Sequence, residues 1–367
     1  MIKTIVSAEL PADEVLRIRK HRILPASVTD PKEQRRLQEE KNPRGYKRIC
    51  IVTGIHGDEL EGQYAAFALQ QKIKEEPEAL TGIVDIYPAM NPMGIDTITR
   101  GMPDFDLDMN RIFPGNENGD MYEHLVHGIV KDVEGASLAV DIHASNIFLT
   151  EVPQIRINEI TQRKLLGYAS TMNVDLIWIH SNATVLEATF AYTMNALGVP
   201  TLVVEMGVGM RITRSVGDQL VSGILATMKA MGMWKGDTDP VRRPVITSDP
   251  NGVDFLNAPD SGIFVKAVDA GTNVRKGDLV GTLINPLTGD VVHHIRAPHE
   301  GWLFTIREYP VVQEGSLMGR ILKGVHYKPE LQKNRDRIRV AESLSDREKR
   351  GNGEDGHAAL QEGGMRS

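Results

Sequence analysis

The chain has 367 residues, of which 41% are hydrophobic and 25% are charged, and its formal net charge is −7. This composition is typical of a globular protein with a sizeable core, and the length favours two domains over one. The acidic balance, the 5% content of aromatic residues and the lack of a basic stripe argue against nucleic acid as a partner.

Residues 1–47 are predicted to form an N-terminal strand and a charged segment. The opening residues are strand-like and lack the long apolar core and cleavage site of a signal peptide. Residues 30–41 are mostly charged, which predicts a solvated helix or loop. No apolar run approaches ~20 residues, so no membrane span is expected. Because Cys50 is the only cysteine, no intrachain disulfide can form, and the cytoplasm is the expected location.

From residue 48 to residue 237, apolar strands alternate with amphipathic helices. Strands are predicted at 49–53, 83–88, 138–142, 174–179 and 201–204, and helices at 60–74, 186–197 and 216–231. This alternation predicts an α/β domain with a mixed, mostly parallel sheet that is flanked by helices. Functional side chains of such sheets gather at the carboxyl ends of strands. We therefore expect residues 48–237 to form the catalytic domain.

Two histidines and a glutamate follow predicted strands and have the character of metal ligands. His56 and Glu59 lie in the glycine-containing turn after the first of these strands, and His143 follows the third. Two imidazoles and a carboxylate can hold one zinc ion and leave a fourth position open for water, which is the arrangement of a hydrolytic centre. Asp141, two residues before His143, can buttress its imidazole. Taken singly, each residue also has an ordinary structural explanation, such as a first-turn carboxylate favoured by the helix dipole.

Further polar residues supply the other parts of a hydrolytic site. Glu205 follows the last predicted strand and is a candidate general base, which would take a proton from water and pass it to a leaving amine. Asn110 and Arg111 combine an amide with a guanidinium fork, which suits a substrate carboxylate. Arg100 and Arg156 are candidates for transition-state charge and for a substrate carboxylate, respectively. The structural alternatives are a strand-end salt bridge for Glu205 and a surface ion pair for Arg111.

A change of composition near residue 238 predicts a separate C-terminal β domain over residues 238–327. Two similar strand–turn–strand units follow one another, the first at 262–264 and 277–281 and the second at 301–304 and 315–319. They predict a small β-sandwich or flattened barrel that resembles the biotinyl/lipoyl fold. No lysine lies between residues 282 and 297, where a carrier would need one, so no carrier function is expected. Residues 328–367 are predicted to be a charged, disordered tail.

Five short motifs in sequence order resemble the succinylglutamate desuccinylase/aspartoacylase family, a branch of the zinc carboxypeptidase fold. They are Gly-Ile-His-Gly-Asp-Glu at 54–59, Asn-Pro at 91–92, Asp-Met-Asn-Arg at 108–111, Asp-Ile-His at 141–143 and Val-Glu-Met-Gly at 204–207. The similarity extends over about residues 48–325, including the C-terminal β region.

The resemblance implies roles for the same residues. It implies one zinc ion per subunit, held by His56, Glu59 and His143, with Glu205 as the general base. It further implies that Arg100 polarises the substrate carbonyl and that Asn110 and Arg111 bind the substrate carboxylate. The segment 154–156, which contains Arg156, resembles a segment of the deacetylase-like members.

These observations predict a cytoplasmic, zinc-dependent amidohydrolase that removes an acetyl- or succinyl-type acyl group from an amino acid or related small amine. The expected partner is a small N-acylated substrate, without nucleic acid or membrane. Homo-oligomers are common among enzymes of this size, so self-association is left open. Two alternatives stay open as well, namely a zinc carboxypeptidase acting on short peptides and a non-catalytic small-ligand-binding relative.

Overall fold

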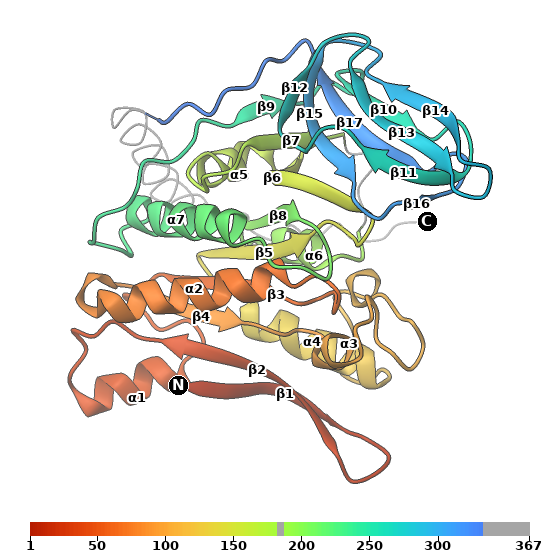
Figure 1. Ribbon diagram of the computed structural model, residues 1–367. Helices are drawn as coiled ribbons and strands as arrows, with labels where there is room; N and C mark the ends of the chain where they lie inside the picture. Colours follow the sequence, from red (N-terminus) through yellow and green to blue (C-terminus); the bar gives the residue numbers. More distant parts are fainter. Residues whose placement is uncertain (182–186, 333–367) are drawn as a thin grey trace, which may run out of the picture.

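A mixed sheet of 13 strands runs through the molecule (Figure 1). The structure is a computed structural model, and it describes residues 1–181 and 187–332. The strand order is β1-β2-β4-β3-β5-β8-β6-β15-β17-β10, while β7 pairs with β6 and β9, and β12 pairs with β15. The mixed α/β fold predicted from the sequence is therefore confirmed.

The centre of the sheet is parallel and buried on both faces. Its strands are β3 (Arg48–Thr53), β4 (Ile83–Tyr87), β5 (Leu138–Ala144) and β8 (Thr201–Gly207). Nearly every residue in them is buried, as expected for parallel strands that are covered by helices on both sides. These strands fall where the alternating sequence pattern predicted them.

Helices cover both faces of this sheet, as predicted. One face packs against α2 (Glu61–Glu75), α5 (Gln162–Ala169) and α7 (Arg214–Ala230), and the other against α4 (Met121–Val133) and α6 (Phe190–Ala196). Short helical segments are η1 (Pro77–Ala79), α3 (Pro92–Thr97) and η2 (Met109–Arg111). The helix predicted at 186–197 corresponds to α6, and residue 186 lies outside the described residues. None of the described helices combines the length and the apolar character that a membrane span requires.

The prediction of a mostly parallel sheet holds only for the centre. β6 (Leu149–Asn158) runs antiparallel to β8, and β7 (Leu176–His180) and β9 (Val245–Thr247) continue beyond it in parallel. The sequence pattern did not reveal β6, because Glu151, Gln154 and Arg156 interrupt its apolar residues. Glu151 and Gln154 are buried, and Glu151 and Arg156 line a cavity. Polar residues thus occupy positions on this strand where a prediction from sequence expects apolar ones.

The N-terminal segment contains the predicted opening strand, a second strand and, within residues 30–41, a mostly exposed helix. It forms an antiparallel pair, β1 (Ile2–Glu9) and β2 (Val15–Ile23), followed by α1 (Pro31–Glu39). The side chain of Asp30 caps α1 by accepting a hydrogen bond from the amide of Lys32, and Pro31 suits the first helical turn. β2 pairs antiparallel with β4, so this segment extends the central sheet.

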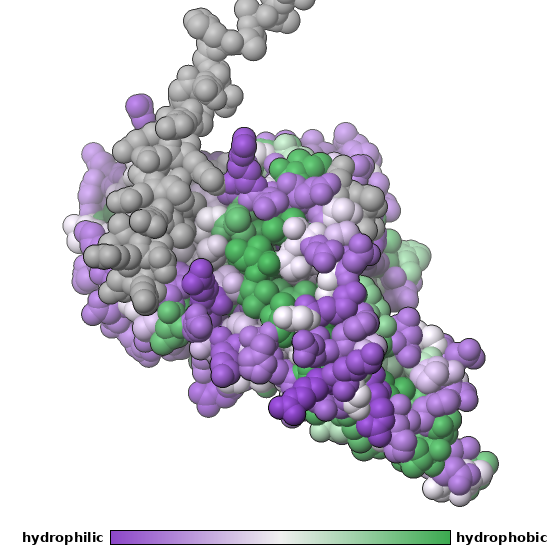
Figure 2. Space-filling model, turned by 90° about the horizontal axis from the view of Figure 1, so that it is seen from above, coloured by the Kyte–Doolittle hydropathy of each residue, from purple (hydrophilic) through white to green (hydrophobic). Residues whose placement is uncertain are grey.

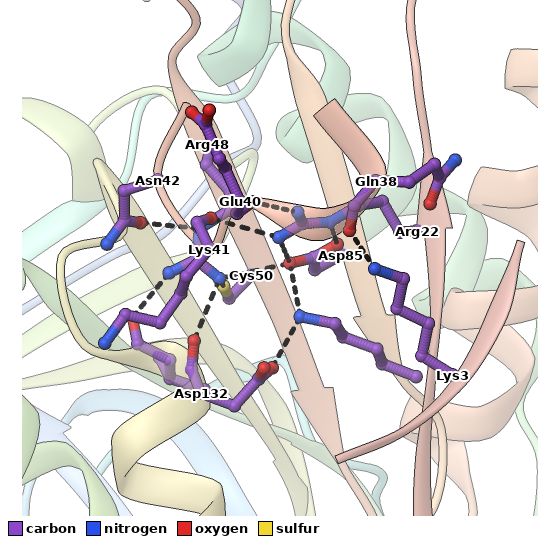
Figure 3. Close-up of polar contacts among 12 residues, drawn as sticks. Lys3, Arg22, Gln38, Glu40, Lys41, Asn42, Arg48, Cys50, Asp85 and Asp132 are labelled. Atoms are coloured by element: carbon purple, nitrogen blue, oxygen red, sulfur yellow. Dashed lines mark hydrogen bonds and ion pairs between the residues drawn. The ribbon is translucent and has the colours of Figure 1, made fainter. Parts of the chain in front are cut away.

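Buried ion pairs fasten this segment to the sheet (Figure 3). Asp85 on β4 accepts hydrogen bonds from Arg22, at 2.7 and 2.8 Å, and from Lys20 and Arg48, both at 3.1 Å. Lys20 also pairs with Asp132 at 2.6 Å. The two arginines donate as well to carbonyl groups at the C-terminal ends of α1 and α4. These five residues, called here the Asp85 cluster, join two helices to three strands.

The C-terminal strands are divided between two sheets. β10 (Val253–Asn257), β12 (Thr272–Val274), β15 (Gly301–Arg307) and β17 (Leu317–Lys323) belong to the large sheet, whereas β11 (Gly262–Lys266), β13 (Leu279–Asn285), β14 (Asp290–Arg296) and β16 (Val311–Val312) form a second sheet. Apolar side chains from both sheets share one cluster. β15 pairs with β6, so the large sheet continues from the central strands into this region.

The separate C-terminal domain and its likeness to the biotinyl/lipoyl fold stay predictions, and most of the predicted tail lies outside the described residues.

Seen from above, the end of the molecule that carries the C-terminal strands shows a band of apolar side chains between hydrophilic ones (Figure 2). Exposed large apolar residues in this part of the chain include Ile246, Phe255, Val265 and Val291.

Candidate active site

A cavity of about 720 Å³ lies at the edge of the sheet where β3, β5 and β8 end. All of the site residues that were predicted from the sequence line it, namely His56, Glu59, Arg100, Asn110, Arg111, His143, Arg156 and Glu205. Segments that are separated by up to about 150 residues in the chain thus meet in one place, as expected for the carboxyl ends of parallel strands.

The turn between β3 and α2 presents His56 and Glu59 to this cavity. Gly54 has a φ of +70°, a conformation that favours glycine. A Cβ atom at Gly57 would lie 2.1 Å from the backbone of Gly94, so this position leaves room for no side chain. His143 lies near the end of β5, and all three candidate ligands are buried.

The ligand atoms of His56, Glu59 and His143 all lie within 4.8 Å of one another. The Nδ1 atoms of the two histidines are 3.2 Å apart, and each lies within 2.9 Å of a different oxygen of Glu59. Three buried ligand atoms at these distances can share one cation. Two imidazoles with one carboxylate form a ligand set that zinc accepts. The residues present therefore fit a zinc ion.

The electrostatic surroundings agree with a cation at this position. Burial by itself would lower the pKa of His143, but the carboxylates of Asp141 and Glu59 hold it well above its ordinary value. Burial would likewise raise the pKa of Glu59, but the two imidazoles lower it strongly. The carboxylates of this group therefore stabilise a positive charge, which is either a bound metal ion or a proton on an imidazole. Metal binding would compete with protonation of the imidazoles.

Two further carboxylates orient the histidine rings. Asp141 Oδ2 lies 3.2 Å from Nε2 of His143, the neighbour predicted from its position two residues earlier. Asp108 Oδ1 lies 3.1 Å from Nε2 of His56. Carboxylates behind metal-binding histidines fix the ring orientation and the tautomer. The sequence analysis did not single out Asp108 for this position, although it belongs to the motif at 108–111.

Arg100, Asn110 and Arg111 line the same cavity as this group. Arg100 donates to Glu59 Oε1 at 2.6 Å and also lies 3.1 Å from Nε2 of His56. Asn110 Oδ1 accepts a hydrogen bond from the backbone amide of Phe190 at the start of α6, which leaves its NH2 group as a donor. Arg111 is 46% exposed and lies 3.6 Å from Asp108, so its guanidinium is accessible to a ligand.

Glu205 lies directly beside His143 in the pairing of β5 with β8. Its Oε1 atom is 3.2 Å from Nη1 of Arg156. Burial raises the pKa of Glu205 above its ordinary value, although Arg156 and His143 act in the other direction. A carboxylate with a raised pKa is better matched to proton transfer near neutral pH.

Three charged or polar residues that the sequence analysis did not assign to the site line the same cavity: Glu151, His180 and Arg320. Glu151 is 2% exposed and accepts hydrogen bonds from Arg156 at 2.9 Å and from Arg320 at 2.5 Å. Arg320 lies on β17, 169 residues after Glu151, and the pairings of β17 with β15 and of β15 with β6 bring the two together. No local pattern in the sequence marks such a contact.

Comparisons with known proteins agree with this geometry. The family model for the succinylglutamate desuccinylase/aspartoacylase catalytic domain matches residues 46–231, just over half of the chain. The N-alpha-acetyl-L-2,4-diaminobutyric acid deacetylase of Halomonas elongata is 24% identical over 277 residues, which cover 73% of this chain and 79% of that protein.

Solved structures share the fold at low sequence identity. A succinylglutamate desuccinylase from a Silicibacter species has a TM-score of 0.70 and 20% identity, with 89% of this chain and 93% of that chain covered. The product-bound Ectoine utilization protein EutE (DoeB) from Ruegeria pomeroyi has a TM-score of 0.69 and 20% identity, with 87% and 93% covered.

Proposed function

Because the chain belongs to the succinylglutamate desuccinylase/aspartoacylase family, we propose that it is a zinc-dependent amidohydrolase that removes an acetyl- or succinyl-type acyl group from an amino acid or related small amine. The observation that carries the proposal is the convergence of His56, Glu59 and His143 beside Glu205 in one cavity. The names of the relatives, a deacetylase and a desuccinylase, support the reaction class.

In this proposal His56, Glu59 and His143 hold the zinc ion. When bound, zinc supplies a Lewis acid for the amide carbonyl and makes water a better nucleophile near neutral pH. Asp141 and Asp108 keep the two imidazoles oriented toward the shared position.

Substrate binding falls to Asn110 and Arg111. The Arg111 guanidinium lines the cavity and is 46% exposed, and its Nη1 atom donates to the carbonyl oxygen of Asn110 and lies 3.6 Å from Asp108. Its other donors can form a charge-assisted contact with the α-carboxylate of an N-acyl amino acid. The NH2 group of Asn110 adds a second donor, while its carbonyl holds the start of α6 in place. Fixing the carboxylate orients the amide, and orientation contributes to the rate.

Glu205 is the proposed general base and Arg100 the proposed oxyanion donor. Glu205 takes the proton from the attacking water and passes it to the leaving amine. Arg100 lies against Glu59 and His56, at the edge where the carbonyl oxygen of the substrate develops negative charge. A well-aimed donor of this kind contributes roughly 3–4 kcal/mol of transition-state stabilisation.

The test is a substrate screen with the purified full-length chain, in which the release of free amine is measured. We expect hydrolysis of N-acetyl or N-succinyl amino acids, loss of turnover on chelation and recovery on addition of zinc. His56→Ala should lose both the metal, measured by elemental analysis, and the activity. An active, zinc-free His56→Ala protein would refute the site. Turnover of short peptides alone would favour a carboxypeptidase, and a zinc-loaded chain without any turnover would favour the binding protein.

A further inference from the structure

A buried glutamate lies next to the candidate metal ligands but does not line the cavity. Glu61 is the first residue of α2, two positions after Glu59, and it is 0% exposed. No lysine, arginine or histidine within residues 1–181 and 187–332 forms an ion pair with it. Burying a carboxylate without a paired cation costs free energy, so other groups around Glu61 must compensate for it.

The Glu61 carboxylate contacts both ends of the segment that connects β8 with α7, residues 207–213. Its Oε2 atom accepts a hydrogen bond from the amide of Thr213 at 2.8 Å. A Cβ atom on Gly207 would lie 2.2 Å from Oε1, so the carboxylate lies directly against the backbone of Gly207. Since α2 and α7 lie side by side (Figure 1), one side chain at the start of α2 can hold this segment in place.

The 207–213 segment contacts both parts of the chain that supply the candidate ligands. The amide of Met210 donates to the carbonyl oxygen of Asp58 at 2.6 Å, within the turn between β3 and α2. The amide of Gly209 donates to the carbonyl oxygen of Asn146 at 3.3 Å, just after β5. A displacement of this segment would therefore be transmitted to the backbone on which the candidate ligands lie.

The contact between Met210 and Asp58 is maintained against backbone strain. Met210 has a φ of +59°, a conformation that is unfavourable for a side chain other than that of asparagine or aspartate. Its side chain is half exposed, so side-chain packing does not account for the conformation. Strained conformations persist only where the surrounding structure determines them. The hydrogen bonds of the 207–213 segment to Asp58, Asn146 and Glu61 are interactions of this kind.

We propose that Glu61 is a positioning residue for the candidate metal site, which acts through the 207–213 segment to hold the turn with His56 and Glu59 in place. The inference rests on the proposed function, because it concerns the zinc ion that these ligands would bind. The structural alternative is that Glu61 only stabilises α2, whose N-terminus favours a negative charge. That alternative requires the charge of Glu61, but neither the length of its side chain nor its contacts with the 207–213 segment.

Two variants of the full-length chain separate length from charge. Glu61→Asp keeps the charge in the first turn of α2, but its side chain is too short to keep both contacts with the 207–213 segment. Glu61→Gln keeps the length and an acceptor oxygen but removes the charge. Competition between the metal-free protein and a chelator measures the zinc affinity. We expect a loss of about 10-fold in Glu61→Asp, the lower end of the range for residues that orient metal ligands, and an affinity close to that of the wild type in Glu61→Gln.

Asp175→Asn is the matched control, because Asp175 is also a buried carboxylate that does not line the cavity. It accepts hydrogen bonds from Arg242 and Tyr327, both at 2.6 Å. This variant should have a lower free energy of unfolding, while the zinc affinity of the folded protein should be unchanged. Gly209→Ala provides a second test if Glu61→Asp does not fold. Its Cβ atom would lie 2.9 Å from the backbone nitrogen of Ile147, so the 207–213 segment must move and the zinc affinity should again fall.

An unchanged zinc affinity in Glu61→Asp, or in Gly209→Ala where it replaces that variant, would overturn the positioning role. An equal or larger loss in Glu61→Gln would also overturn it, because the effect would then belong to the charge. If the wild type binds no zinc, the proposed function fails, and amide hydrogen exchange of the metal-free chain tests the positioning separately. Faster exchange over residues 54–60 and 207–213 in Glu61→Asp than in the wild type and Glu61→Gln supports it, and equal exchange in all three overturns it.

Discussion

Two groups of mostly buried charged and polar side chains lie on the large sheet. One is the Asp85 cluster, on β2, β3, β4 and the adjoining α4, and the other is formed by cavity residues on β5, β6, β7, β8 and β17. In the first, Asp85 contacts three cations, and the arginines direct their other donors to the ends of α1 and α4 (Figure 3). Among the described residues, no side-chain atom of the Asp85 cluster is buried without a partner, whereas Asp141, Arg156, His180 and Arg320 each have such an atom.

This difference separates a group that stabilises the fold from one that is prepared for a ligand. A buried polar network is favourable when every member is satisfied and unfavourable when some members are not. The Asp85 cluster is satisfied by the protein alone. The cavity residues named above are satisfied only in part by the protein.

Glu205→Gln is expected to have the largest effect, and it should be confined to activity. Removing a general base lowers kcat/KM by about 10²- to 10⁴-fold. The free energy of unfolding should be unchanged or higher, because the neutral amide removes a buried carboxylate whose pKa is raised by burial. Kinetics and denaturant titration measure these two quantities, and elemental analysis should show that the variant keeps its zinc. Normal turnover would remove the base assignment, and a large loss of stability would show that Glu205 has a structural function instead.

Asp85→Asn should show the opposite behaviour. It leaves Lys20, Arg22 and Arg48 buried without their shared anion, a change that typically costs about 3–5 kcal/mol of stability. The value of kcat/KM per folded molecule should be unchanged. The control is Glu33→Gln, which breaks the solvent-screened pair with Arg36 and should change stability far less than Asp85→Asn. Lost activity at unchanged stability would contradict the separation of the two groups.

The same two groups mark the limit of sequence analysis. The central strands and the residues His56, Glu59, His143 and Glu205 were placed correctly at one sheet edge, because each follows a clear apolar strand. The partners of these residues depend on contacts between distant strands. Arg320 reaches Glu151 through two successive strand pairings, and Arg22 reaches Asp85 through the pairing of β2 with β4.

Acid titration gives a smaller effect that is specific to the Asp85 cluster. Burial raises the pKa of Asp85, but Arg22, Lys20 and Arg48 outweigh it and lower the pKa to about 2. Because the folded-state pKa is depressed, the stabilisation is fully present above the unfolded value near 4 and is lost as the pH falls through about 2. The contribution is about 2 kcal/mol. Denaturant titrations between pH 2 and 5 should show a weaker pH dependence in Asp85→Asn than in the wild type, and parallel curves would contradict the depressed pKa.

Arg156→Leu gives the smallest expected effect, and it tests whether the cavity charges adjust chemistry. Arg156 is the strongest influence that opposes the raised pKa of Glu205, so its removal raises that pKa further. A base acts only when it is ionised, which means that activity is present above its pKa and is lost as the pH falls through it. The acidic limb of the profile of kcat/KM against pH should therefore move to higher pH in Arg156→Leu.

Arg156→Lys is the matched control, because it keeps the positive charge but loses the planar fork, and its acidic limb should stay close to that of the wild type. An unmoved limb in Arg156→Leu would show that the contact at 3.2 Å does not influence the base. Equal shifts in both variants would assign the effect to geometry rather than to charge. A shift in the leucine variant alone would establish that the positive charge of Arg156 adjusts proton transfer by Glu205. The arginines of the Asp85 cluster, which have no contact with Glu205, would then differ from Arg156 in function as well as in pairing.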